Sequence, residues 1–204
     1  MDEIVKQAMA KWPNVPHVYG WLALDRRGVW RIKGDAVTNA VISGFIGRNY
    51  AHDDGGRWFF QNGPQRVFVE LDYTPFIYRI VWNADPHARL RIETHTGSSV
   101  HCIDSAWLDE TGVLLLATEH GAGLLDDRNL ELLLPWLTDH AGNALDEETI
   151  AARMEALQAA NDADLHLNHA GRRVPLRAIA STAVAAKFGY VPKPLPPTGE
   201  EPCY

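Results

Sequence analysis

Short stretches of alternating apolar and polar residues run along this chain, and tight turns separate them. The pattern Leu-Asp-x-x-Gly-Val occurs twice, at 24–29 and at 108–113, each time between apolar segments. An Asp carboxylate can cap such a turn, and the Gly three residues later can adopt the positive φ that this type of hairpin loop requires. The pattern therefore predicts one β-hairpin in each half of the chain.

Two more hairpins are predicted between these turns. The segments 57–61 and 66–72 pair across a four-residue loop, and this pairing leaves one face of the hairpin wholly apolar. The segments 90–95 and 100–103 pair across the turn 96–99. The middle of the chain is therefore expected to consist mainly of antiparallel strands.

Apolar residues at helical spacing predict several short helices. Thr38 and Asp146 are suitable N-caps, and Gly189 is a suitable stop. Pro135 is unfavourable in the interior of a helix, and it falls inside one of the predicted segments. The predicted helices span 2–11, 38–50, 127–137, 147–160 and 180–188.

Hairpins and short helices together predict an α+β fold, in which antiparallel hairpins form one or two small curved sheets and the helices pack on them. Each half runs from a hairpin through a helix to an acidic Gly turn, at 53–56 and at 139–142. An internal duplication explains this order; the alternative is that D-x-x-G is simply a common hairpin loop. The expected parts are an N-terminal helix in 1–16, a first β-rich lobe in 17–95, a second lobe in 96–190 and a Pro-rich tail in 191–204.

Composition narrows the class of protein. The formal net charge of -7 argues against broad binding to nucleic acid or to anionic lipid. No apolar run approaches the roughly 18 residues of a membrane span, and the sequence starts with acidic residues where a secretory signal would be basic. Cys102 and Cys203 specify neither a disulfide framework nor a Cys-based zinc site. We therefore expect a cytoplasmic protein without a membrane partner.

Several short motifs follow one another between Gly20 and about Leu134. They are Leu24–Trp30 with Gly34, the Ile42–Ile46 helix, Arg57–Phe60, Gln65–Glu70 and Thr74-Pro75-Phe76. In this order they resemble an uncharacterised bacterial family, the domain of unknown function numbered about 1285, and a proteobacterial sister family without an assigned role. The resemblance implies a compact antiparallel β-rich fold with packed helices. It implies no activity and no catalytic residue, and it does not extend beyond about residue 145.

Histidines and acids cluster in one predicted hairpin, at Glu93, His95, His101, Cys102 and Asp104. Strand alternation places His95 and His101 on opposite faces, so they cannot share one ion at about 2.1 Å each. The run 52–54, His-Asp-Asp, offers oxygen ligands for a divalent cation, although such a cluster before Gly-Gly is more often a solvated turn. We predict no metal and no cofactor.

Other motifs give little support to catalysis or to nucleic-acid binding. The chain has no G-x-S-x-G elbow, and the Gly-Ala-Gly at 121–123 lacks the Lys of a phosphate loop. Four basic residues, Arg26, Arg27, Arg31 and Lys33, lie near Trp30. Alternation places Trp30 on the face opposite Arg31 and Lys33, whereas a base-stacking platform needs its aromatic and basic side chains on one face. This argues against a nucleic-acid partner.

The end of the helix predicted at 38–50 and the polar face of the 57–72 hairpin carry side chains suited to an anion. If the two approach each other, their guanidinium and amide groups converge on a small anion or on a partner carboxylate. The alternative is a set of surface salt bridges with Glu70 and Asp72. The candidate ligand-binding residues are Arg48, Asn49, Tyr50, Arg57, Gln61 and Arg66.

These observations favour a non-catalytic module that binds a small anionic ligand or a protein and that serves a regulatory role. The alternatives are an enzyme with a dispersed His and carboxylate acid–base site, and a structural subunit of a larger assembly. A binding module predicts a concave pocket lined by Arg and aromatic residues. An enzyme predicts acids or histidines with shifted pKa values in a cleft, and a subunit predicts a large apolar patch.

The anion hypothesis predicts that phosphorylated or carboxylated metabolites raise the melting temperature of the wild-type protein more than that of Arg66→Ala. The reason is that this substitution removes a charge-assisted hydrogen-bond donor. A thermal-shift screen measures the difference, and identical responses of the two proteins would reject this site.

Overall fold

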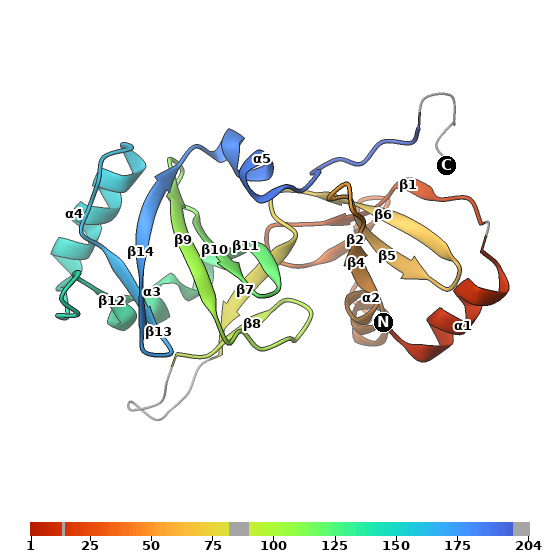
Figure 1. The fold of residues 1–204 in the computed structure, drawn as a ribbon, viewed down its shortest axis with the longest axis horizontal. Coiled ribbons are helices and arrows are strands. Elements are labelled where there is room, and N and C mark those ends of the chain that lie inside the picture. The colour runs from red at the N-terminus through yellow and green to blue at the C-terminus, as the bar shows by residue number, and fades with distance from the viewer. Residues whose placement is uncertain (14, 82–89, 198–204) are drawn as a thin grey trace. The chain divides into compact units, whose positions relative to one another are not determined.

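The computed structural model describes residues 1–13, 15–81 and 90–197, and the chain has an α+β fold, as predicted. These residues form two compact units (Figure 1). The first unit comprises Met1–Pro75 and the segment that begins at Gly189, and the second is Phe76–Phe188. The chain therefore leaves the first unit once and later returns to complete it.

The first unit is built on a mixed sheet. Within the described residues its strand order is β3-β2-β1-β6-β5-β4, and β1 and β6 are parallel while the other neighbours are antiparallel. Helix α2 packs on one face, where Phe45 meets Phe60 edge to face at 5.5 Å. The elements are α1 (Glu3–Lys11), β1 (Val18–Leu24), β2 (Trp30–Ile32), β3 (Asp35–Ala36), α2 (Ala40–Arg48), β4 (Tyr50–His52), β5 (Trp58–Asn62) and β6 (Gln65–Leu71).

The register of β5 and β6 is the predicted one, because Phe60 lies opposite Val67. The two faces of this sheet bury different aromatic groups. On the α2 face Trp30 is 2% exposed and contacts Tyr50 at 5.0 Å between ring centroids. The opposite face buries a smaller cluster of Tyr19, Phe59 and Phe68.

The second unit contains a larger mixed sheet, with the order β12-β13-β14-β9-β10-β11-β7-β8 in the described part of the chain. The pairs β14–β9 and β11–β7 are parallel. The strands are β7 (Phe76–Ile80), β8 (Ile92–Thr94), β9 (Ile103–Asp109), β10 (Leu114–Thr118), β11 (Gly121–Leu125), β12 (Leu137–Thr138), β13 (His166–His169) and β14 (Arg172–Ile179). The helices are η1 (Asp127–Asn129), α3 (Leu130–Leu133), η2 (Leu134–Trp136), α4 (Glu147–Gln158), η3 (Ser181–Ala183) and α5 (Val184–Phe188).

Two sequence predictions for this unit need correction. The hairpin predicted at 90–95 and 100–103 forms only next to its turn, where Glu93 and Ser99 make an antiparallel bridge and Val100 donates its N–H to the carbonyl of Ile92 at 2.8 Å. The predicted pairing of Ile92 with Ile103 is wrong, because Ile103–Asp109 pairs with β10. The chain diverges because the Glu119 carboxylate accepts the backbone N–H groups of His101 and Cys102, at 2.6 and 3.1 Å. The helix predicted at 127–137 is divided into η1, α3 and η2, and Pro135 lies in η2.

Gly123 shows why the Gly-Ala-Gly segment is a strand. A Cβ at this position would lie 2.5 Å from Cε2 of Tyr78, so only glycine lets β11 approach β7 this closely. The hydroxyl of Tyr78 in turn donates to the carbonyl of Gly121 at 2.8 Å. The glycines serve packing between strands and do not form a phosphate loop.

Six strands of each sheet have the same topology. The order β3-β2-β1-β6-β5-β4 corresponds to β11-β10-β9-β14-β13-β12, and the directions of all neighbouring pairs agree. In both sheets the first strand of the D-x-x-G hairpin is parallel to the last strand. This correspondence supports an internal duplication over chance recurrence of a turn.

The Pro-rich tail begins inside the first unit. Val191 donates its N–H to the carbonyl of Gly56 at 2.9 Å, and the carbonyl of Pro192 accepts the N–H of Leu71 at 2.8 Å. Residues 198–204 of the predicted tail lie outside the described residues. The part that is described continues the hydrogen bonding of the first sheet.

Gly56 should be essential for this docking, because its φ is +73° and a Cβ would lie 2.1 Å from the carbonyl oxygen of Gly189. Gly20 has a similar φ of +71° and no atom within 4 Å of a built Cβ. We expect Gly20→Ala to cost about 1–2 kcal/mol from backbone strain alone, and Gly56→Ala to cost about 3 kcal/mol or more. Urea unfolding of both variants tests this. Equal losses would show that the tail does not constrain Gly56.

Candidate functional site

The predicted anion-binding residues occupy two places in the first unit. At the end of α2, Arg48 contacts the Asp2 carboxylate at 3.3 Å. The side-chain carbonyl of Asn49 accepts the N–H of Asp2 at 2.8 Å, and Asn49 is only 1% exposed. Tyr50 donates its hydroxyl to the carbonyl of Pro75 at 3.1 Å. Through these contacts the three residues connect the start of α1, the end of α2 and the segment that ends at Pro75.

Arg57, Gln61 and Arg66 lie on the sheet face opposite to α2. The guanidinium groups of Arg57 and Arg66 lie over the rings of Phe68 and Phe59, at 4.9 and 4.5 Å from the ring centroids. Gln61 is the cross-strand partner of Arg66 and is 1% exposed. Its side-chain oxygen has no hydrogen-bond partner among the described residues. The structure therefore brings these three residues together and separates them from Arg48.

The candidate anion-binding residues include three arginines, and carboxylates neutralise two of them, Arg48 and Arg57. Arg57 binds Asp53 through two nitrogens, at 2.7 and 2.8 Å. Partial burial alone would raise the pKa of Asp53, but the hydrogen bonds from Arg57 outweigh it and leave the pKa below its usual value. A hydrogen bond from Arg48 likewise lowers the pKa of Asp2. Within the described segments only Arg66 of the three lacks a carboxylate partner, since Glu70 contacts Lys193 instead at 3.7 Å.

The predicted cluster of histidines and acids is dispersed. His95 is enclosed, and its Nδ1 accepts the backbone N–H of Ile77 at 3.3 Å. Arg172 donates to the sulfur of Cys102 at 2.8 Å, and Cys102 contacts Asp104 at 3.4 Å. Over residues 1–13, 15–81 and 90–197, no three His, Cys, Asp or Glu side chains are grouped to hold a metal ion.

The basic first hairpin is engaged internally. Arg31 contacts Asp25 at 3.1 Å, and Arg26 lies over the ring of Tyr73 at 4.5 Å. Lys33 lies over the ring of Trp21 at 4.2 Å. Each of these three cations has a partner within the first unit. The hairpin therefore does not present these basic side chains, together with free aromatic rings, as a surface for nucleic acid.

A cleft of about 610 Å³ lies in the second unit, where the ends of β9 and β14 meet the C-terminal end of α4. We name it the Trp107 cleft. Trp107 and Arg177 are cross-strand partners in the parallel β9–β14 pair. Its lining residues are Trp107, Glu110, Leu157, Gln158, Ala160, Asp162, Arg177, Ala178, Ile179 and Ala180.

Two cations lie against the indole of Trp107. The Lys187 ammonium of α5 is 4.1 Å from the ring centroid, and the Arg177 guanidinium is 5.6 Å away. The Trp107 Nε1–H donates to Ser105 at 3.0 Å, which fixes the orientation of the ring. In the described part of the chain neither cation has a carboxylate within ion-pair distance. The indole of Trp107 thus contacts one cation that lines the cleft, Arg177, and a second one on α5, Lys187.

The rest of the cleft is held rigidly. The carboxylate of Glu110 accepts the backbone N–H and the hydroxyl of Ser181 at 2.8 and 2.5 Å, and these bonds lower the pKa of Glu110. Ala160 follows α4 with a φ of +58°, a conformation that costs a non-glycine residue energy. Backbone strain of this kind often accompanies a binding site.

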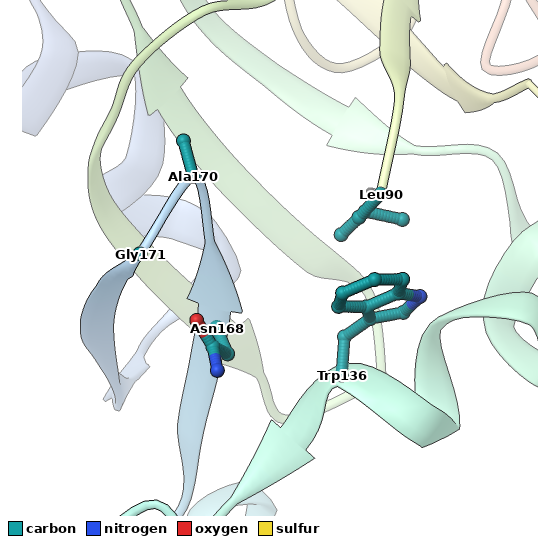
Figure 2. Close-up of a pocket in the computed structure, with 5 residues that line it drawn as sticks. All are labelled: Leu90, Trp136, Asn168, Ala170 and Gly171. Atoms are coloured by element: carbon teal, nitrogen blue, oxygen red, sulfur yellow. The ribbon is translucent and has the colours of Figure 1, made fainter. Parts of the chain in front are cut away.

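A second cavity of about 250 Å³ lies elsewhere in the second unit. Figure 2 shows Leu90 and Trp136 on one side of it and Asn168 with the turn 170–171 on the other. Among the residues that the structure describes, it shares none with the Trp107 cleft, and none of its lining residues is charged. The two cavities therefore suit ligands of different chemistry.

Sequence reasoning did not identify the Trp107 cleft. Alternation within 172–179 could have placed Arg173, Arg177 and Pro175 on one face of a strand. The parallel pairing of that strand with 103–109 carries no local signal, because the two segments are about 70 residues apart in the chain. Trp107 and Arg177 therefore meet through topology alone.

Comparison with solved structures identifies the fold. A crystal structure of a DUF1285 family protein from Silicibacter pomeroyi DSS-3 matches 88% of this chain and 97% of that chain, with a TM-score of 0.54 and 14% sequence identity. A DUF1285 family protein from Shewanella baltica OS155 matches 54% of this chain and 87% of that one, with a TM-score of 0.42 and 20% identity. The family resemblance expected from the sequence is confirmed, but the expected limit near residue 145 is wrong, because the first of these matches covers 88% of the chain.

The family itself is shown by a sequence profile. The profile of DUF2944, described as "Protein of unknown function (DUF2946)", matches residues 1–195, and the chain belongs to this family. No curated protein matches the chain. None of the helices in the described residues has the length and apolar character needed to cross a membrane.

Burial of His95 predicts a specific loss of stability in acid. Burial, assisted by the charge of Arg79, lowers the pKa of His95 to about 3, so the unfolded chain binds a proton that the folded chain does not between about pH 6.5 and 3. The free energy of unfolding should fall by about 1.4 kcal/mol for each pH unit below about 6.5 because of this residue. Asn at this position keeps an acceptor for Ile77 but does not titrate. Urea unfolding of wild type and His95→Asn between pH 7 and 5 should differ in slope, and parallel curves would contradict the prediction.

Proposed function

We propose that this protein is a cytoplasmic, non-catalytic binding module and that the Trp107 cleft takes a small organic anion. The observation that carries the proposal is Arg177, which lines the cleft and lies over the indole of Trp107, together with Lys187 of α5, which lies over the same ring. Arg forms paired hydrogen bonds with carboxylate or phosphate oxygens, and Lys adds a point charge. The cleft volume of about 610 Å³ lies within the ~300–1,000 Å³ typical of small-molecule sites.

Glu110, one of the two acids that line the cleft, favours binding over catalysis. A general acid that works near neutral pH needs a raised pKa. The pKa of Glu110 is lowered instead, because Ser181 donates two hydrogen bonds to its carboxylate. Glu110 thus acts as a structural acceptor that anchors the start of η3, and the other charged residues that line the cleft are Arg177 and Asp162.

The residues predicted from the sequence remain a second candidate site. Arg66 supports it, because this guanidinium lies on Phe59 and has no carboxylate partner among the described residues. Arg48 and Arg57 weaken it, because each already contacts an aspartate. The two candidates lie in different units, so single substitutions separate them.

Calorimetric titration with succinate, citrate and inorganic phosphate tests the proposal in the wild type, Arg177→Gln, Lys187→Gln and Arg66→Ala. We expect saturable binding of at least one anion by the wild type. Arg177→Gln should weaken it about 10- to 100-fold through loss of a charge-assisted hydrogen bond worth about 1.5–3 kcal/mol. Arg66→Ala should bind as the wild type does.

Matched variants make the outcome decisive. Arg91→Gln removes an exposed arginine of the same unit that contacts Glu93 at 3.4 Å, and should leave binding unchanged. Loss of binding in Arg66→Ala but not in Arg177→Gln would move the site to the first unit. Equal binding by all variants, or no binding of any anion, would reject the Trp107 cleft as an anion site.

A further inference from the structure

The second cavity has walls of contrasting character. Leu90 and the indole of Trp136 lie together on one side, and the side chain of Asn168 lies on the other (Figure 2). Leu137 pairs with Leu167, and this register sets Trp136 level with Asn168 across β12 and β13. The two walls are therefore held at a fixed spacing by a β-ladder.

The turn between β13 and β14 keeps the cavity open. Ala170 and Gly171 have φ of +50° and +78°, which are values for the two central residues of a tight hairpin turn. Asn, Asp or Gly usually occupies both places, because a side chain is strained there. The small side chain of Ala170 accepts this strain and leaves space beside Asn168, where a larger residue would reach into the cavity.

The cavity offers one hydrogen-bonding group that is still available. The Asn168 amide carries both a donor and an acceptor, and among the described residues neither has a hydrogen-bond partner. None of the lining residues that the structure describes carries a charge. Such a lining suits a neutral ligand that presents a donor beside an acceptor and otherwise contacts apolar atoms.

We propose that this cavity binds a neutral, planar nitrogen heterocycle of nucleobase size. The volume of about 250 Å³ is below the ~300–1,000 Å³ of sites for larger ligands, so it admits a single ring system. A flat ring fills the space beside Leu90 and Trp136, and aromatic side chains bind such rings favourably. The amide of Asn can make two hydrogen bonds to one edge of the ring, as it does with adenine.

The occupant is a free base and not a nucleic-acid strand. A strand needs basic groups along its phosphates, but the lining residues are Leu, Trp, Asn, Ala and Gly, and the chain carries a net charge of -7. This proposal does not depend on the Trp107 cleft, because the two cavities have no residue in common.

NMR titration of the tryptophan indole N–H signals tests the inference, with adenine as the probe and indole as a flat comparator that lacks the donor–acceptor edge. The signal of Trp136 is assigned from its absence in Trp136→Leu. We expect adenine to shift this signal saturably in the wild type. Asn168→Leu, which keeps the size of the side chain, should weaken adenine binding about 5- to 100-fold and leave indole binding unchanged.

Two controls separate the possible results. Arg177→Gln should bind adenine as the wild type does, whatever its effect on anions. Adenine and indole binding equally well to the wild type and to Asn168→Leu would overturn the proposal, because the cavity would then be a purely apolar slot. Absence of a saturable shift of the Trp136 signal in the wild type would overturn it as well. If Trp136→Leu does not fold, Trp136→Phe assigns the signal and Asn168→Leu still decides.

Discussion

The structure depends on one interaction that occurs four times, the capping of a tight turn by an Asp carboxylate. In the D-x-x-G turns that start at Asp25, Asp53, Asp109 and Asp139, the carboxylate accepts the backbone N–H four residues later, at 2.8–3.0 Å. The turn Gly has a positive φ each time, between 73° and 91°. Asp109 is completely buried, so an unpaired carboxylate there would be costly. Three of these turns join the two strands of a hairpin, and the fourth, at Asp139, ends β12 and carries the antiparallel bridge between Thr138 and Ala144.

Local features of the fold could be predicted from the sequence because the capped turns involve residues that are close together in the chain. The D-x-x-G hairpins and the register of Phe60 with Val67 involve residues close in the chain, and alternation identifies their faces. The parallel pairs β1–β6 and β9–β14 could not be predicted, because their partners are distant in sequence and share no turn. The hairpin predicted at 90–103, which forms only next to its turn, shows a third situation. Its turn forms, but Glu119, which lies beyond it in the chain, takes the next two backbone donors and redirects the strand.

The same distinction applies to the candidate sites. The grouping of Arg57 with Arg66 could be predicted, because both belong to one hairpin. The contact of Arg57 with Asp53, four residues earlier, was within reach of sequence reasoning, whereas the contact of Arg48 with Asp2 required the docking of α1 on α2. The Trp107 cleft depends on a parallel strand pair and on α5. A basic residue in a sequence is therefore a candidate ligand only after its acidic neighbours in space are known.

Comparison of the two sheets shows where function can have diverged. Leu24 and Leu108 occupy the same place before the Asp of their turns, so Trp107 corresponds to Ala23, and its partner Arg177 corresponds to Glu70. The aromatic–cation pair of the second unit is thus replaced in the first by a small residue and an acid. Helix α4, whose end closes the Trp107 cleft, lies between β12 and β13, whereas β4 and β5 are joined by the D-x-x-G turn alone. The shared turns build the scaffold of both units, and the cleft is built from side chains and a helix that only the second unit has acquired.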